Sequence, residues 1–250
     1  MRITRWWLVS FIFLTAVWFS CRSVPVTGAL SVGRFENLAL YHRSSHPSRV
    51  AVFISGDGGW HSDLAEVAED LASMDCLVIG VDISRYLEVV DNDSASCIEL
   101  ASDFHEMVRS VEERLGYEHP VSAILIGHSA GASMVYGILM QASPGTFRGG
   151  ISLGFSPGYE SPKPFCGRPG LVSNWNEDTG EYDLEMGGRI PVPWIAIHGT
   201  ADTVCSFRDA VEFVQKVQGA KFVKLNGADH SITAPKMISA LKKALHQIAG

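Results

Sequence analysis

The sequence predicts an α/β fold in which a mostly parallel central sheet is covered by helices on both faces. The chain has 250 residues, 46% of them hydrophobic, which is enough for one large domain with its own core. Short apolar runs rich in β-branched residues alternate with segments of helical periodicity. The runs are continuously apolar, which is typical of strands buried on both faces of a parallel sheet.

The predicted elements follow one another in a regular order. An antiparallel start is expected at 31–33 and 36–42, followed by a strand at 50–55, a helix at 61–73 and a strand at 76–81. Further helices are expected at 95–115, 130–140, 207–217 and 235–248, and further strands at 121–126, 150–153, 194–197 and 221–225. Residues 155–190 break this rhythm, and their prolines, glycines and aromatic residues predict an ordered, loop-rich cap over a site.

The N-terminus has the pattern of an export signal. Arg2 and Arg5 precede an apolar run that extends to Phe19, about 14 residues long, too short for an ordinary membrane span. We therefore expect residues 1–20 to be a signal peptide or lipoprotein signal and residues 29–250 to form a single domain.

Five cysteines bear on the compartment. Cys21 follows the apolar run, as in a bacterial lipoprotein cleavage site, so we expect a periplasmic or cell-envelope protein, with lipid attachment at Cys21 left open. The remaining four, Cys76, Cys97, Cys166 and Cys205, permit two disulfides in three connectivities. Cys166–Cys205 is the first expectation, and Cys76 is alternatively a small buried hydrophobic residue.

Charge and spacing exclude other classes of function. The net charge is −7, and no basic run is longer than Lys242-Lys243, which argues against a nucleic-acid partner. The histidines show no metal-ligand spacing, so neither a metal nor another cofactor is expected.

The clearest chemical motif is Gly127-His128-Ser129-Ala130-Gly131. It fits G-x-S-x-G, and it stands where a predicted strand ends and a helix begins, as a nucleophile elbow requires. A plain glycine-rich turn is the alternative. The context favours an α/β-hydrolase fold with Ser129 as nucleophile.

A serine nucleophile requires a base that is oriented by an acid. In this fold the chain order is Ser, acid, His, which selects Asp202 and His230, each just past a predicted strand. Asp229 is the alternative acid. The other histidines considered, His105, His119, His198 and His246, lie in predicted helices, at the opposite sheet edge or in a turn.

Backbone N–H groups would bind the oxyanion of the reaction intermediate. We expect one from Ala130, directly after the nucleophile, and one from Asp57 in the glycine-rich loop after the strand at 50–55. Alternatively, those glycines only form a tight turn.

The chain resembles the VirJ/AcvB family of bacterial virulence proteins, a branch of the α/β-hydrolases. The resemblance rests on Ser-Gly-Asp-Gly-Gly-Trp at 55–60, Gly-Val-Asp-Ile-Ser-Arg-Tyr at 80–86, the elbow at Ser129 and the loop of His230. It implies an exported serine esterase that hydrolyses aminoacyl-phosphatidylglycerol, a lysyl or alanyl ester, at a membrane surface.

The substrate's ammonium group would pair with Asp57 or with an acidic residue of the cap; alternatively, the acidic residues of the cap only form a solvated loop. The candidates in the cap are Glu177, Asp178, Glu181, Asp183 and Glu185. Trp60 and Tyr86 line the pocket or, alternatively, pack in the core. Two other functions stay open: a serine hydrolase acting on another ester or a peptide, and a non-catalytic partner of a secretion apparatus.

Overall fold

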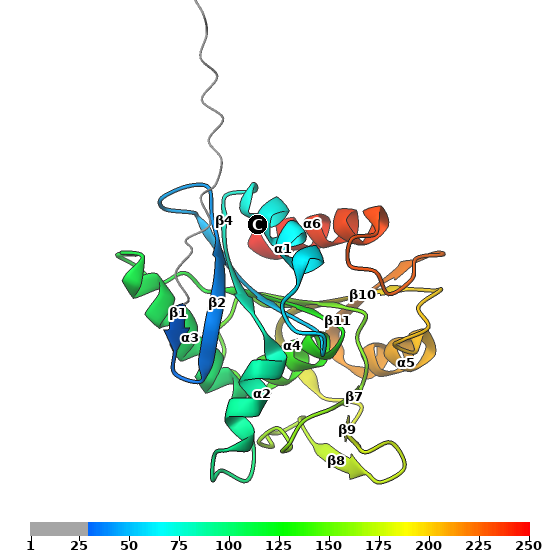
Figure 1. Cartoon of the computed structure of the whole chain (residues 1–250). Helices are drawn as coiled ribbons and strands as arrows, with labels where there is room; N and C mark the ends of the chain where they lie inside the picture. Colours follow the sequence, from blue (N-terminus) through cyan, green and yellow to red (C-terminus); the bar gives the residue numbers. More distant parts are fainter. Residues whose placement is uncertain (1–29) are drawn as a thin grey trace, which may run out of the picture.

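The structure is a computed structural model that describes residues 30–250, so the expected signal and Cys21 lie outside the described residues. An eight-stranded sheet runs through the molecule in the order β1-β2-β4-β3-β5-β6-β10-β11 (Figure 1). Its strands are β1 (Leu30–Val32), β2 (Phe35–Tyr41), β3 (Arg49–Ile54), β4 (Cys76–Val81), β5 (Ile124–His128), β6 (Gly149–Leu153), β10 (Arg189–Gly199) and β11 (Gln218–Leu225). The β1–β2 and β2–β4 pairs are antiparallel and all others are parallel, which confirms the predicted fold class.

Helices cover both faces of the sheet. They are α1 (Ser62–Ala72), α2 (Ile83–Asp91), α3 (Leu100–Arg114), α4 (Ala130–Gln141), α5 (Phe207–Lys216) and α6 (Pro235–Ala249). Helices α1 and α6 lie on one side, and α3, α4 and α5 lie on the other (Figure 1). Helix α2 was not predicted: its buried residues Ile83, Tyr86 and Val90 share one face, and the Asp82 carboxylate caps it by accepting from Arg85 N–H.

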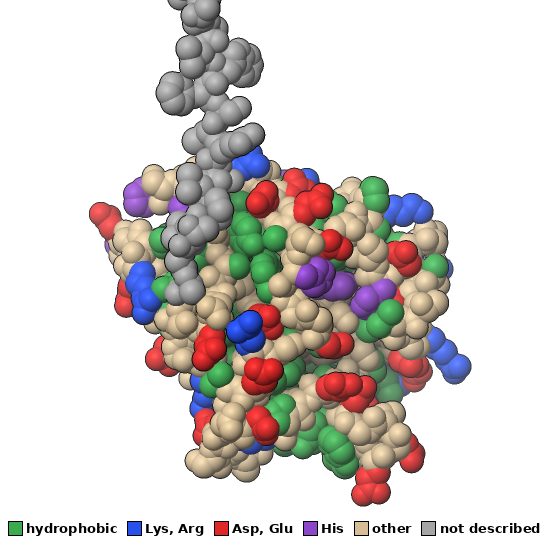
Figure 2. All heavy atoms as spheres, viewed as in Figure 1, with side chains coloured by type: hydrophobic (Ala, Val, Ile, Leu, Met, Phe, Trp, Pro, Cys, Tyr) green, Lys and Arg blue, Asp and Glu red, His purple; other side chains and the backbone are tan. Residues whose placement is uncertain are grey.

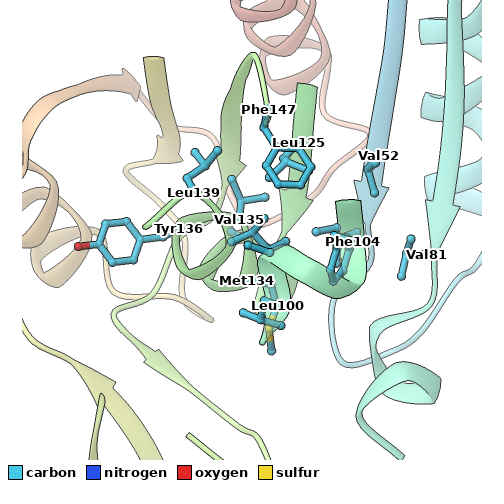
Figure 3. Packing of buried hydrophobic residues seen from close by; sticks show 14 of the residues in the cluster. Val52, Val81, Leu100, Phe104, Leu125, Met134, Val135, Tyr136, Leu139 and Phe147 are labelled. Atoms are coloured by element: carbon cyan, nitrogen blue, oxygen red, sulfur yellow. The ribbon is translucent and has the colours of Figure 1, made fainter. Parts of the chain in front are cut away.

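The larger core anchors the helix that follows the elbow. Val135 and Leu139 of α4 pack with Leu125 and Phe147 (Figure 3). Every residue of α4 from Gly131 to Gln141 is buried, so the start of this helix is fixed against the sheet.

The insertion at 155–190 contains a small antiparallel sheet of order β7-β9-β8. Its strands are β7 (Gly158–Tyr159), β8 (Ser173–Asn176) and β9 (Glu181–Leu184). Tyr159 stacks on Phe165 with ring centroids 3.9 Å apart, and its hydroxyl accepts from Phe165 N–H. Aromatic packing therefore orders this segment where simple periodicity is missing.

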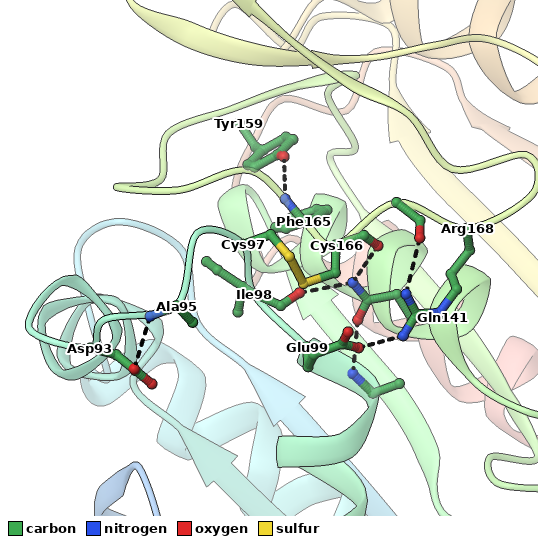
Figure 4. Close-up of a disulfide and its surroundings, with 12 residues drawn as sticks. Asp93, Ala95, Cys97, Ile98, Glu99, Gln141, Tyr159, Phe165, Cys166 and Arg168 are labelled. Atoms are coloured by element: carbon green, nitrogen blue, oxygen red, sulfur yellow. Dashed lines mark hydrogen bonds and ion pairs between the residues drawn. A yellow bond between two sulfur atoms is a disulfide. The ribbon is translucent and has the colours of Figure 1, made fainter.

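The disulfide joins Cys97 to Cys166, so the expected pairing of Cys166 with Cys205 was wrong (Figure 4). Cys97 precedes α3, and its neighbour Ile98 exchanges backbone hydrogen bonds with the loop of Cys166. The Gln141 amide donates to the carbonyl oxygens of Ile98 and Cys166 and strengthens the junction (Figure 4). Cys76 and Cys205 are free and buried, and burial raises the pKa of Cys76 to about 12.

Candidate active site

Ser129 stands at a sharp turn between β5 and α4. Its φ is 56° and its ψ is −123°, a conformation that a non-glycine residue adopts only under constraint. The turn needs glycine on both sides: a Cβ at Gly127 would lie 2.0 Å from the Gly131 oxygen, and a Cβ at Gly131 would lie 2.4 Å from the Ser55 oxygen. Ser129 N–H donates to the Leu153 carbonyl oxygen at 3.0 Å, which ties the elbow to β6. This is the geometry that the G-x-S-x-G spacing predicts.

Asp202 and His230, which lie in loops after β10 and β11, form a hydrogen-bonded pair. His230 Nδ1 lies 2.7 Å from Asp202 Oδ2, and the Asp202 side chain has no exposed surface. The N–H groups of Val204 and Cys205 donate to Asp202 Oδ1, each at 2.9 Å. Burial alone would raise the pKa of Asp202, but hydrogen bonds from His230, Cys205 and Val204 outweigh it and lower the pKa. The carboxylate therefore stays ionised and can orient the imidazole.

Ser129 lies near this pair but is not hydrogen-bonded to it. Among residues 30–250, no hydrogen bond joins Ser129 Oγ to His230. Burial raises the pKa of the neighbouring Cys205 thiol to about 12, and the Ser129 side chain lowers it by a smaller amount. Proton transfer to His230 therefore requires the Ser129 hydroxyl to come within hydrogen-bond distance of the imidazole.

Gly154, which sequence reasoning missed, makes room for the base. It follows β6, has a φ of +64°, and a Cβ there would lie 2.9 Å from His230 Cε1. A glycine directly after a strand was the available signal.

Two further histidines, His128 and His198, lie against the Asp202–His230 pair. Neither of them was given a role in the site from the sequence. His128 Nε2 lies 3.0 Å from the His230 carbonyl oxygen, and the two rings are 4.8 Å apart. Burial lowers the pKa of His128 to about 4, so it is neutral near pH 7 and donates to that oxygen. His198 also approaches Asp202, with Nε2 3.3 Å from Oδ2.

The expected oxyanion donors border the nucleophile. A Cβ on Gly56, next to Asp57, would lie 2.9 Å from Ser129 Cβ, so this loop packs directly against the nucleophile. The Asp57 carbonyl oxygen accepts from Ser84 Oγ, which fixes the peptide. In the turns and caps of the described residues, neither Asp57 N–H nor Ala130 N–H has a partner, so both are free to bind an oxyanion.

A cavity of about 520 Å³ opens beside these donors. Its lining includes Asp57, Ala130 and the carboxylates of Glu88, Asp91 and Glu160, and it includes neither lysine nor arginine. Glu181 lies nearby: burial, followed by the charges of Glu160, Asp183 and Asp57, raises its pKa. Figure 2 shows grouped histidines (purple) with acidic side chains (red) below them. The cavity therefore favours a cationic ligand.

Two residues expected to contact substrate do not line this cavity. Tyr86 is 1% exposed, stacks on Phe35, and donates its hydroxyl to Asp103 Oδ2 at 2.7 Å. Trp60 donates from Nε1 to Tyr41 and packs edge-on against Phe53. Their alternative assignment, to core packing, fits the structure because Tyr86 belongs to one hydrophobic cluster and Trp60 packs against the other.

The described part of the chain offers no group of three metal-ligating side chains. Within residues 30–250, no helix has both the length and the apolar character needed to cross a bilayer.

Residues 48–148 match the family model of the bacterial virulence protein VirJ. The resemblance to the VirJ family is therefore confirmed over this segment. It includes the glycine-rich loop, the residues around Tyr86 and the elbow, but not Asp202 or His230. No curated protein sequence matches the chain.

Solved structures confirm the α/β-hydrolase fold. The chain is similar to the ferulic acid complex of Est1E from Butyrivibrio proteoclasticus, with a TM-score of 0.58, 16% identity and coverage of 86% of this chain and 97% of that one. It is similar to the esterase domain of a Rhodothermus marinus protein, with a TM-score of 0.54, 16% identity and coverage of 86% and 92%. A putative dienelactone hydrolase from Klebsiella pneumoniae gives a TM-score of 0.56, 13% identity and coverage of 86% and 93%.

Proposed function

We propose that this protein is a serine esterase that hydrolyses aminoacyl-phosphatidylglycerol, with Ser129 as nucleophile, His230 as base and Asp202 as the orienting acid. The observation that carries the proposal is the strained elbow at Ser129 beside the buried Asp202–His230 pair. A glycine-flanked turn that only connected a strand to a helix would need no such pair nearby.

In the reaction, Ser129 Oγ attacks the ester carbonyl while His230 takes the hydroxyl proton. The N–H groups of Ala130 and Asp57 bind the developing oxyanion. His230 then gives the proton to the departing glycerol oxygen, which leaves the aminoacyl group on Ser129. Water, activated by His230, hydrolyses this acyl-enzyme and releases the amino acid.

The acidic cavity supports an aminoacyl substrate. A lysyl or alanyl ester carries an ammonium group close to the scissile carbonyl, and Asp57, Glu88 and Glu160 line the same cavity as Ala130. An acyl group bearing positive charge would gain Coulomb energy there, whereas a fatty acyl chain would meet carboxylates.

We also propose that the protein is exported to the periplasm or cell envelope, where it meets its lipid substrate. The Cys97–Cys166 disulfide supports an oxidising compartment. The signal-like N-terminus and Cys21 support export and attachment to the membrane surface.

A fluorophosphonate probe tests the nucleophile. The wild type and Ser62→Ala, a substitution of an exposed serine on α1, should be labelled. Ser129→Ala should not be. Absence of labelling in all three proteins, with folding verified by circular dichroism, would favour the non-catalytic alternative.

Purified protein presented with lysyl-phosphatidylglycerol in mixed micelles tests the substrate. Release of lysine by the wild type and not by Ser129→Ala is expected. A labelled enzyme that cleaves simple esters but releases no lysine or alanine would indicate a serine hydrolase acting on another substrate.

A further inference from the structure

His198, at the end of β10, is fully buried against the loop that carries the acid. Its Nε2 lies 3.2 Å from the Cys205 carbonyl oxygen and 3.3 Å from Asp202 Oδ2. Its ring packs against Phe207 and Phe222, with centroids 5.9 Å and 6.4 Å away. Its other nitrogen, Nδ1, is buried without a hydrogen-bond partner.

These contacts fix the proton of His198 on Nε2. Both neighbours of Nε2 are acceptors, whereas Nδ1 faces no donor or acceptor, so the Nε2–H tautomer satisfies the larger number of groups. Burial lowers the pKa of His198, outweighing the hydrogen bond to Cys205 and the attraction of Asp202. The ring is therefore a neutral donor at neutral pH.

We propose that His198 is a positioning residue of the catalytic set: its Nε2–H donates to the Cys205 carbonyl oxygen and lies 3.3 Å from the Asp202 oxygen that accepts the hydrogen bond from His230. This rests on the proposed function of that set. Asp202 Oδ1 accepts hydrogen bonds from Val204 and Cys205 N–H, Oδ2 accepts one from His230, and His198 Nε2 lies 3.3 Å from Oδ2. The hydrogen bond from His198 to the Cys205 carbonyl oxygen ties the loop that carries Asp202 to the end of β10.

The contact between His198 Nε2 and Asp202 Oδ2 has an electrostatic consequence. The positive N–H edge of His198, 3.3 Å from Oδ2, weakens the attraction of this carboxylate for an imidazolium at His230. Asp202 keeps its position without His198, because Val204 and Cys205 still hold Oδ1. Removing the His198 donor should therefore favour protonated His230 and move the acid limb of the pH profile upward.

Other titratable groups near the pair do not account for this shift. His128 faces His230 from β5, His61 acts on His128, and the Cys205 thiol faces Ser129. All three groups are present in the wild type and in both His198 variants. The groups that face the His198 ring itself are Asp202 and His230.

His198→Phe and His198→Gln form a matched pair for the test. Phe fills the apolar site beside Phe207 and Phe222 without supplying a donor, whereas the Gln side chain retains an N–H. The assay is kcat and KM for p-nitrophenyl acetate from pH 5 to pH 9, which does not depend on the natural substrate.

We expect His198→Phe to lower kcat about tenfold with KM within about twofold, and to raise the acid limb by about half a pH unit. His198→Gln should keep the wild-type limb. The proposal would be overturned if the acid limb of the pH profile stayed in place or moved downward in a folded His198→Phe variant. It would also be overturned if His198→Gln showed the same profile as His198→Phe.

The proton resonance of the His230–Asp202 hydrogen bond gives a second measurement if His198→Phe is poorly stable. The chemical shift of this proton should change in His198→Phe and stay at its wild-type value in His198→Gln. The wild type could hydrolyse the ester and react with fluorophosphonate while neither the acid limb nor the proton resonance changes in His198→Phe. That result would refute the role of His198 and leave the proposed function intact. A wild type without esterase activity would instead contradict the proposed function.

Discussion

The disulfide permits a quantitative prediction about stability. Cys97 and Cys166 are 69 residues apart, so the bridge closes a loop of about 70 residues in the unfolded chain. On the chain-entropy estimate, a loop of that size destabilises the unfolded state by about 4 kcal/mol at 25 °C. Replacing both cysteines by alanine should lower the free energy of unfolding by that order and the melting temperature by roughly 10 °C.

The measurement is urea unfolding of the wild type and of Cys97→Ala/Cys166→Ala, each with and without reductant. Because Cys76 and Cys205 are free, reductant should destabilise the wild type and leave the double variant unchanged. A loss below about 1 kcal/mol would refute the argument from loop closure. A double variant that still responds to reductant would refute the connectivity.

Four further outcomes are expected. Asp202→Asn should lower kcat by about 10³–10⁴-fold in ester hydrolysis, since the amide cannot hold His230 in the required tautomer; a loss under tenfold would contradict its role. Gly154→Ala should lower kcat/KM by about tenfold or more, because a Cβ would lie 2.9 Å from His230 Cε1 at a φ of +64°; wild-type kinetics would show that the ring accommodates it. Glu160→Gln should raise KM for a lysyl ester several-fold and leave p-nitrophenyl acetate unchanged, and equal effects on both would argue against charge recognition. His128 has a pKa lowered to about 4 in the folded state, so the unfolded chain binds more protons between about pH 4 and pH 6.5. Stability should therefore decrease as pH falls through this window, and His128→Gln should flatten the decrease in urea unfolding measured at several pH values.

The sequence alone predicted the order of strands and helices because periodicity is local. Strands β3 to β6 and helices α1 and α4 fall within a few residues of their expected bounds. The elbow at Ser129 was predictable too, since it is contained in five consecutive residues. Asp202 and His230 followed from chain order and from the rule that parallel strands end at one edge of the sheet.

Tertiary packing decided what local patterns leave open. Cys166 pairs with Cys97 because the cap loop lies beside the start of α3, a proximity that no spacing encodes. Tyr86 turns into the core because the unpredicted helix α2 presents it to Phe35 and Asp103. The contact of His198 with Asp202 also depends on a turn that brings a strand end and the following loop together. Short-range sequence therefore determined the elements and the reactive residue types, whereas long-range contacts determined which side chains meet, because only the folded chain fixes distances between distant residues.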